Sequence, residues 1–442
     1  MISVSLCVLC DPDFAVATLK FKPINAVRWF IWGTLALVFA VLPLVFREGF
    51  ALTLMSQMGI MIIFALSYNM LLGQTGLLSF GHAVYMGLGA YFAIHALNLI
   101  GQGKLAFPVT LLPLVGGFSA ALFGALIGWV TTRKAGVAFA MISLGIGEMV
   151  HAMSLMFPAF FGGEGGVNGN RMAGQAVLGI TYGPAIQVYY LIAFWTFLSM
   201  AAMFALAQTP LGRIANAVRD NEERAEFIGY STERVRLLMF VLSAFFAGIA
   251  GGLAAINYEI VTAETVSTLR SGAVLLAAYI GGVAFFFGPV IGAVIFTFFQ
   301  TALSGITKAW LLYLGLFFIA IVMFAPGGIA MILMQNLRVW KFGLLGRLLP
   351  RYGWALAAGL VALAGFCGIV EMIYHVSAAG AAAELNLGGV SVAPAGAAPW
   401  LACGTLLAAG GCLYLVAWRR VRTEWDEVQR EIEAKIVTLG AV

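Results

Sequence analysis

Stretches of about 18 or more apolar residues recur along most of this chain. A helix needs about 20 such residues to cross the hydrocarbon core of a bilayer, so the recurrence predicts an all-α fold, a polytopic helical membrane protein. Composition agrees, because 62% of the 442 residues are hydrophobic and 10% are charged, whereas about a quarter are charged in a soluble domain. A membrane β-barrel is excluded, because barrel strands alternate in polarity over about ten residues.

The apolar stretches predict a core of ten spans and a C-terminal hairpin of two more. Glycine or proline interrupts some of them, as is common in transporter helices. We expect the first span to be retained, because it is too long for the core of a signal peptide. The expected spans are residues 29–46, 50–72, 73–100, 107–131, 137–157, 185–208, 237–257, 271–287, 289–304, 309–334, 354–376 and 400–418.

Basic residues orient this arrangement, because Lys and Arg concentrate in cytoplasmic loops. They predict that both termini are cytoplasmic. The net charge of +5 says nothing about nucleic acid and reflects cytoplasmic basic residues that face anionic lipid. The predicted parts are a cytoplasmic N-terminal segment (1–28), a transmembrane core (29–337) with a cytoplasmic loop (209–236), a basic cytoplasmic linker (338–353), a transmembrane hairpin (354–418) and a cytoplasmic amphipathic tail (419–442).

Residues 209–236, TPLGRIANAVRDNEERAEFIGYSTERVR, are the main charged stretch. They hold five arginines and five acids, while the whole chain has 24 basic and 19 acidic side chains. Pro210 suits the start of a helix and Gly229 its end. A helix this short and charged is marginal alone in water, so we expect it to lie against another surface. The predicted helix has one apolar stripe, formed by Ile214, Val218, Ala225 and Ile228.

A few polar side chains lie within the apolar stretches, where each is costly. Glu148 and His151 are three residues apart in the fifth span, so they face the same way and could share a proton or a hydrogen bond. They are either a pathway or gating pair or a structural contact between helices. A second group lies across the turn between the second and third spans, where we favour a pathway or a helix break over capping; it comprises Asn69, Gln74, Ser79 and His82.

Small residues and the tail carry two further predictions. Three Gly-x3-Gly spacings, which begin at Gly124, Gly248 and Gly288, favour close helix packing.

The tail spaces apolar residues on one helical face, which favours a helix on the membrane surface over a regulatory contact. That face comprises Trp425, Val428, Ile432, Ile436 and Leu439.

Several chemistries have no support in the sequence. The chain lacks a Walker motif, HExxH and GxSxG, and its four histidines form no ligand cluster. One CxxC, Cys7 to Cys10, has no second pair. We therefore expect no catalytic residues, no metal, no cofactor and no nucleic-acid partner, and we interpret the chain as a transport subunit rather than an enzyme.

Five segments resemble, in the same order, branched-chain amino-acid ABC transporter permeases. They are GQTGLLSFGHAVYMGLGAYF, SLGIGEMVHA, GGEGGVNG, the charged stretch with the helix that follows it, and IGGVAFFFGPVIGAVI with FAPGGI. The resemblance covers about residues 50–332 and is to the larger of the two permeases that form one channel. Residues from about Trp354 onward depart from the family pattern.

The resemblance implies an importer of Leu, Ile and Val in the bacterial inner membrane. The expected partners are a second permease, two ATP-binding subunits, a periplasmic substrate-binding protein and membrane lipid. The charged stretch would be the helix that couples to an ATPase, with the expected contact residues Arg213, Arg219, Glu222, Glu223, Glu226 and Gly229. The expected translocation pathway comprises Asn69, Gln74, Ser79, His82, Glu148 and His151.

Two alternatives stay open. Within the same importer class, the substrate could be urea, a short amide or a pentose. An ion-coupled secondary transporter would need intramembrane carboxylates, and Glu148 is the one deep candidate in the sequence.

Overall fold

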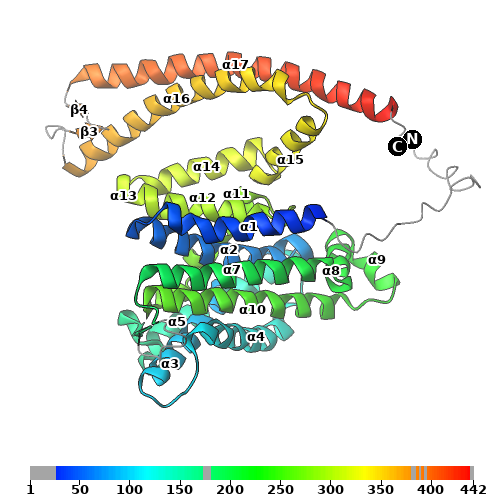
Figure 1. Ribbon diagram of the computed structural model, residues 1–442, viewed down its shortest axis with the longest axis vertical. Helices are drawn as coiled ribbons and strands as arrows, with labels where there is room; N and C mark the ends of the chain where they lie inside the picture. The colour runs from blue at the N-terminus through cyan, green and yellow to red at the C-terminus, as the bar shows by residue number, and fades with distance from the viewer. Residues whose placement is uncertain (1–25, 173–180, 380–384, 388–389, 393–395, 439–442) are drawn as a thin grey trace, which may run out of the picture. The chain divides into compact units, whose positions relative to one another are not determined.

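The computed structural model describes residues 26–172, 181–379, 385–387, 390–392 and 396–438 (Figure 1). The chain divides into two units. Among its described residues the first contains one helix, α1 (Ala26–Val45), with Pro43 inside it. The second runs from Gly49 to Val442 and contains the remaining elements. The Cys7 and Cys10 pair and most of the expected N-terminal segment lie outside the described residues.

The second unit is almost entirely helical. Its main helices are α2 (Gly49–Thr75), α3 (Ala83–Gly101), α4 (Leu112–Thr131), α5 (Gly136–Met156), α7 (Ala185–Gln208), α8 (Pro210–Asp220), α9 (Glu222–Phe227), α10 (Thr232–Tyr258), α11 (Thr268–Gly281), α12 (Gly288–Thr297), α14 (Trp310–Phe324), α15 (Gly328–Lys341), α16 (Leu345–Ala379) and α17 (Ala397–Thr438). Short turns are η2 (Val109–Leu111), α6 (Pro158–Phe161), η3 (Gly163–Gly165), η4 (Ala263–Val266), the π-helix η5 (Phe298–Leu303) and α13 (Ser304–Ile306).

Two small antiparallel pairs complete the described structure. β1 (Val167–Asn168) pairs with β2 (Ile260–Val261), so the glycine-rich segment is joined to the connection between α10 and α11. β3 (Leu385–Leu387) pairs with β4 (Val390–Val392) between the two hairpin helices.

The described residues contain nine helices that are long and apolar enough to cross a membrane, or ten with the pair α14 and α15 as one bent span. This confirms the polytopic all-α prediction. Two expected spans are shorter: Trp29–Val45 and Thr268–Gly281 are apolar but below spanning length. The expected span at 271–287 stops early because the backbone at Gly282 has φ +108, which ends α11 there. The expected span at 309–334 bends by 50° between its two helices.

Helix α10 lies in the middle of the core and packs on α2, α3 and α4. Small residues allow the close approach: a Cβ on Gly248 would clash with the carbonyl oxygen of Gly116, and one on Gly124 would lie 2.6 Å from the Cβ of Ala244. A similar contact joins α11 to α12, where a Cβ on Gly292 would clash with the carbonyl oxygen of Ala277. The three glycine spacings therefore lie at helix contacts, as predicted.

The chain between α2 and α3, residues 76–82, is not helical; Gly76 is exposed, and the residues after it are buried or half-buried. Side chains of other helices bond its backbone and the start of α3: Phe80 N donates to Ser143 Oγ of α5 at 3.0 Å, and Ala83 N, the first residue of α3, donates to Ser271 Oγ of α11 at 3.0 Å. Irregular backbone at membrane depth is tolerated only where protein buries it. We call residues 76–82 the α2–α3 break.

The hairpin helices α16 and α17 pack along each other (Figure 1). The tail is continuous with the second hairpin helix, since α17 extends over 42 residues. Val428 and Ile432 are fully buried against Val339, Leu344 and Leu348. The chain's own linker thus covers this part of the apolar stripe, and the expected placement on the membrane surface is wrong for it. Leu439 and the side chain of Ile436 lie outside the described residues.

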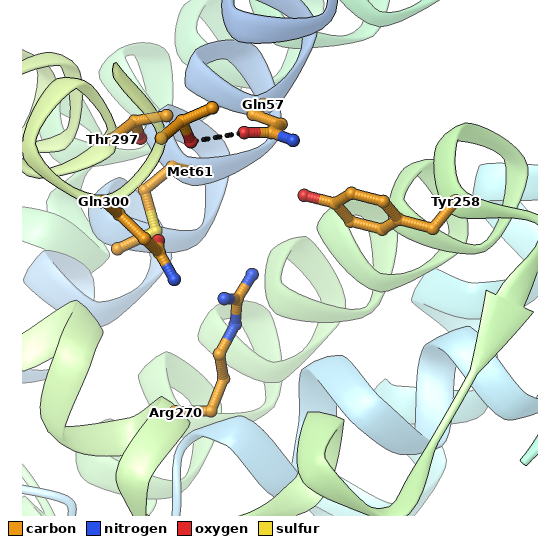
Figure 2. A pocket seen from close by; sticks show the side chains of 7 residues that line it. Gln57, Met61, Tyr258, Arg270, Thr297 and Gln300 are labelled. Atoms are coloured by element: carbon orange, nitrogen blue, oxygen red, sulfur yellow. Dashed lines mark hydrogen bonds between the residues drawn. The ribbon is translucent and has the colours of Figure 1, made fainter. Parts of the chain in front are cut away.

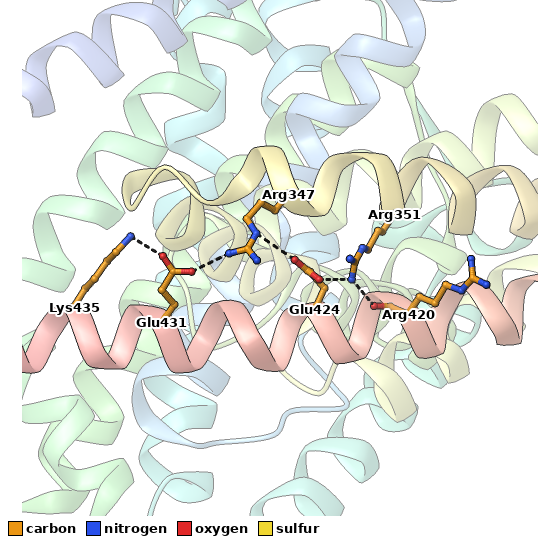
Figure 3. A network of polar contacts seen from close by, with 6 residues as sticks. All are labelled: Arg347, Arg351, Arg420, Glu424, Glu431 and Lys435. Carbon is orange, nitrogen blue, oxygen red and sulfur yellow. Dashed lines mark hydrogen bonds and ion pairs between the residues drawn. The ribbon is translucent and has the colours of Figure 1, made fainter.

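Ion pairs reinforce this contact (Figure 3). Arg347 lies 3.3 Å from Glu424 and 3.0 Å from Glu431, and Arg351 also contacts Glu424. Lys435 lies 3.0 Å from the other oxygen of Glu431. The basic residues of the linker therefore bind the acidic residues of the tail within one chain.

Candidate functional site

The charged stretch forms two helices rather than the single helix expected. Asn221 has an extended backbone between α8 and α9, and its side chain accepts a hydrogen bond from Arg224 N at 2.9 Å, which begins the second helix. The predicted ends are confirmed: Pro210 lies in the first turn of α8, and Gly229 follows α9 with φ +94. Helix α10 begins at Thr232, inside the expected loop. We call residues 209–231 the charged loop and the end of the bundle that carries it the loop end.

One residue of the predicted apolar stripe, Ile228, is exposed rather than buried. Val218 and Ala225 are buried, but Ile228, which follows the end of α9, is 76% exposed. Phe227 is 89% exposed, and Tyr230 beside it is also exposed. Three neighbouring apolar side chains in a charged loop form a surface of the kind that proteins use for contacts. We call Phe227, Ile228 and Tyr230 the apolar tip.

Two contacts hold the charged loop to the membrane helices. Arg219 of α8 donates from Nη1 to the carbonyl oxygen of Gly73, near the end of α2, and its Cγ lies beside Gly76, where the α2–α3 break begins. Arg219 also pairs with Asp220 at 2.9 Å. The charged loop is thus bonded directly to the helix that leads into the break.

The second contact joins α9 to α10. Arg236 Nη2 donates to Glu222 Oε2 at 2.5 Å, and Thr232 Oγ1 donates to Glu226 at 2.8 Å and to Glu222 at 3.2 Å. The hydrogen bond from Arg236 holds the pKa of Glu222 below its ordinary value, and burial opposes it. Three of the six expected coupling residues, Arg219, Glu222 and Glu226, therefore hold the charged loop to the membrane helices. Arg213 and Glu223 are exposed.

The four predicted polar residues at the α2–α3 break are all buried. His82 Nε2 lies 3.0 Å from Ser67 Oγ, and the ring stacks on Phe64 and meets Tyr68 edge-on. Several buried polar atoms here have no hydrogen-bond partner among the described residues. They are Tyr68 Oη, Asn69 Oδ1, Gln74 Oε1, Ser79 Oγ and His82 Nδ1. Unsatisfied buried groups are costly and rare in native structures. Their concentration at the α2–α3 break therefore makes this break a candidate functional element.

Glu148 and His151 each have a partner on another segment. Glu148 Oε1 accepts a hydrogen bond from Thr268 Oγ1 at the start of α11, and His151 Nδ1 lies 3.1 Å from the carbonyl oxygen of Ala263. Both residues therefore hold the segment that leads into α11, and the structure describes no hydrogen bond between the two.

None of the predicted pathway residues lines a cavity of about 150 Å³ that Figure 2 shows. Its walls come from α2, the end of α10, the start of α11, α12 and the π-helix η5. Thr301 Oγ1 donates to Gln57 Oε1 at 2.6 Å across the wall. The lining residues are Gln57, Met61, Tyr258, Arg270, Thr297, Gln300 and Thr301. We call this the Arg270 cavity.

Sequence analysis missed the Arg270 cavity, although one pattern could have indicated it. The topology expected from the sequence places Arg171 and Arg270 on the side opposite the charged loop, against the preference of basic residues for the cytoplasmic side. Arg171 pairs with Glu259 at 3.9 Å. Arg270 makes no ion pair with any acidic side chain in the part of the chain that the structure describes.

Comparison with known proteins assigns the family. Residues 50–326 match the family described as branched-chain amino acid transport system / permease component. The high-affinity branched-chain amino acid transport system permease protein LivM of Salmonella typhimurium is 29% identical over 291 residues, 61% of this chain and 67% of that protein. The high-affinity branched-chain amino acid transport system permease protein LivH, also of Salmonella typhimurium, is 24% identical over 254 residues, 53% of this chain and 78% of LivH.

A third relative matches over a shorter region. The autoinducer 2 import system permease protein LsrC of Photorhabdus laumondii is 28% identical over 153 residues, 33% of this chain and 46% of LsrC. No solved structure matches the chain. Since the family match at residues 50–326 covers more than half of the sequence, this chain belongs to the permease family of branched-chain amino acid transport systems.

Proposed function

We propose that this chain is a permease subunit of an ATP-binding-cassette importer and forms half of the translocation pathway for Leu, Ile and Val. The match of residues 50–326 to the permease family carries this proposal. LivM, named as a permease of branched-chain amino acid transport, is similar over 61% of the chain, against 33% for LsrC. The longer similarity favours amino acids over the other substrates of the importer class.

The partners proposed are a second permease, two ATP-binding subunits and a substrate-binding protein. The charged loop supports an ATP-binding partner, because its apolar tip is exposed beside acidic and basic side chains. An exposed apolar group with a polar rim is typical of a protein contact. In this proposal the loop end faces the cytoplasm, both termini are cytoplasmic, and ATP hydrolysis takes place in the partners.

The Arg219–Gly73 contact supports a route for motion from the loop to the pathway. A displacement of α8 by an ATPase would move the end of α2, because Arg219 bonds the carbonyl oxygen of Gly73 directly. The α2–α3 break follows at once, and its unsatisfied polar atoms lie in the same region. In this proposal the break has a second arrangement that satisfies those atoms, so that it acts as a two-state element. We assign Asn69, Gln74, Ser79 and His82 to this moving element.

Transport by the assembled complex tests the proposal. The chain would be co-expressed with the second permease, the ATP-binding subunits and the binding protein, and the complex would be reconstituted in proteoliposomes. We expect ATP-dependent uptake of labelled leucine, isoleucine and valine, and no uptake of labelled urea or ribose. A complex that assembles but imports urea or ribose in place of the three amino acids would disprove the substrate assignment. Uptake that persists without ATP would disprove the importer class.

A further inference from the structure

We propose that the Arg270 cavity binds the carboxylate of the transported amino acid, with Arg270 as the residue that determines specificity for an anionic group. This inference rests on the proposed function. It names the chemical group of the substrate that this chain recognises, and it places that recognition at the end of the bundle opposite the charged loop.

The first support is the charge of the lining. Arg270 is the one ionisable group that is charged at neutral pH among the residues around the cavity; the others are Tyr258, Met61, two glutamines and two threonines. Figure 2 shows the guanidinium pointing into the same space as the Tyr258 hydroxyl and the Gln300 amide. Arg270 is partly buried, and an opposite charge nearby favours the charged form of such a group. No described acidic side chain supplies one.

The second support is the geometry that a carboxylate requires. A guanidinium binds the two oxygens of a carboxylate with two parallel N–H donors. Tyr258 Oη and the Gln300 amide offer further hydrogen-bond donors from other walls of the cavity. Arg270 lies in the first turn of the 14-residue helix α11, where the helix dipole also favours negative charge. Donors from three segments thus converge on one cavity.

The third support is size. A cavity of about 150 Å³ accommodates a solute about as large as benzene. It therefore admits the charged end of an amino acid. Gln300 and Thr301 belong to the π-helix η5, and π-helical turns occur frequently at functional sites.

Neighbouring contacts hold the arginine in place. Ser267 Oγ accepts a hydrogen bond from Arg270 N at 3.3 Å and caps α11. Thr268, on the same turn, donates to Glu148 of α5. Arg270 lies two residues after Thr268 on the turn that Glu148 holds, so the predicted pathway residue Glu148 acts as a positioning residue for Arg270.

The experiment uses the reconstituted importer with its binding protein loaded with leucine. Two quantities are measured for each variant: uptake of labelled leucine and the ATP hydrolysis that the loaded binding protein stimulates. For Arg270→Gln we expect at least a tenfold loss of uptake while stimulation stays within twofold of the wild type. Arg270→Lys should recover part of the uptake, because it keeps the charge but not the two-pronged geometry. Lys104→Gln, which removes an exposed charge at the same end of the bundle, is the matched control and should leave both quantities unchanged.

A second variant keeps the arginine. Gln300→Glu places a carboxylate on the wall of the cavity, and it should lower uptake at least tenfold by occupying Arg270, even if the Arg270 variants fail to assemble. Wild-type uptake by Arg270→Gln or by Gln300→Glu overturns the carboxylate site, and so does an equal loss of uptake and of stimulated ATP hydrolysis. Failure of the proposed function is distinguishable, because then the wild-type complex itself does not import leucine.

Discussion

The Nη1 atom of Arg219, on α8, donates a hydrogen bond to the carbonyl oxygen of Gly73, near the end of α2. These residues are 146 positions apart in sequence. Their contact joins the charged loop to the helix that leads into the α2–α3 break, so the two candidate sites at this end of the bundle are mechanically connected.

Loss of the Arg219–Gly73 contact should uncouple transport. We expect Arg219→Ala to lower leucine uptake at least fivefold and to reduce the ATP hydrolysis stimulated by loaded binding protein, because a hydrogen bond from a charged group contributes about 1.5–3 kcal/mol. The variant should still assemble. Lys134→Ala, which removes an exposed basic side chain from the connection between α4 and α5, serves as the control. Equal activity of both variants would show that the contact does not transmit motion.

The ion pair between Glu222 and Arg236 predicts a response to acid. Because the pKa of Glu222 is lower in the folded protein, the pair stabilises the fold above the ordinary glutamate pKa of about 4.3, and this stability is lost as pH falls through the lower folded value. Hydrogen exchange of residues 222–236, corrected for its intrinsic rate, should therefore increase on acidification below about pH 4.

Glu222→Gln is the matched variant for this prediction. It leaves the nearly buried Arg236 without a charged acceptor, so the segment should lose about 1–3 kcal/mol of protection at neutral pH and lose its acid response. An acid response unchanged in the variant would assign the titration to another group.

Close packing of α4 on α10 should not tolerate an added methyl group. We expect Gly248→Ala to lower the thermal unfolding temperature of the purified permease by several degrees, since a Cβ there meets the backbone of Gly116 and overpacking costs about 1–3 kcal/mol. Gly145→Ala, in α5, has open space around its Cβ and is the control. If both variants melt at the wild-type temperature, the helices do not approach as closely as described.

Thr268 and Glu148 should affect leucine uptake as one hydrogen-bonded pair that positions Arg270. Glu148→Gln and Thr268→Val are each expected to reduce leucine uptake by about the same factor, and the double variant should be no worse, because contacting residues are not additive. The measurement is uptake divided by the amount of inserted permease. Losses that multiply in the double variant would mean that the two side chains act separately.

The tail should detach when its buried stripe is interrupted. Ile432 is fully buried, and Ile432→Ala should cost about 2–5 kcal/mol of tail packing, which limited proteolysis of residues 424–438 would detect. Glu427→Ala, an exposed change on the same helix, should leave cleavage unchanged. We expect leucine uptake to persist in both variants, because the family match ends at residue 326. Loss of uptake in Ile432→Ala alone would make the tail part of the transport machinery.

The sequence by itself determined the helical membrane class and most helix positions. Helix α7 has the bounds expected for the sixth span, 185–208. Local pattern suffices here because, in hydrocarbon, each segment must satisfy its own backbone hydrogen bonds, and a helix does so without help from the rest of the chain. The ends of the charged loop were also predictable, since Pro210 and Gly229 act through their own backbone preferences.

Tertiary structure decided what depends on residues distant in sequence. Asn221 divides the charged loop into two helices because its side chain caps the second one. The stripe of apolar residues predicted a single helix. The glycine spacings indicated close packing, but only the fold shows that Gly248 meets Gly116. The Arg270 cavity combines Gln57, Tyr258 and Gln300 from separate helices. No local pattern encodes such a cavity, because its shape and its charge arise only where the packed helices meet.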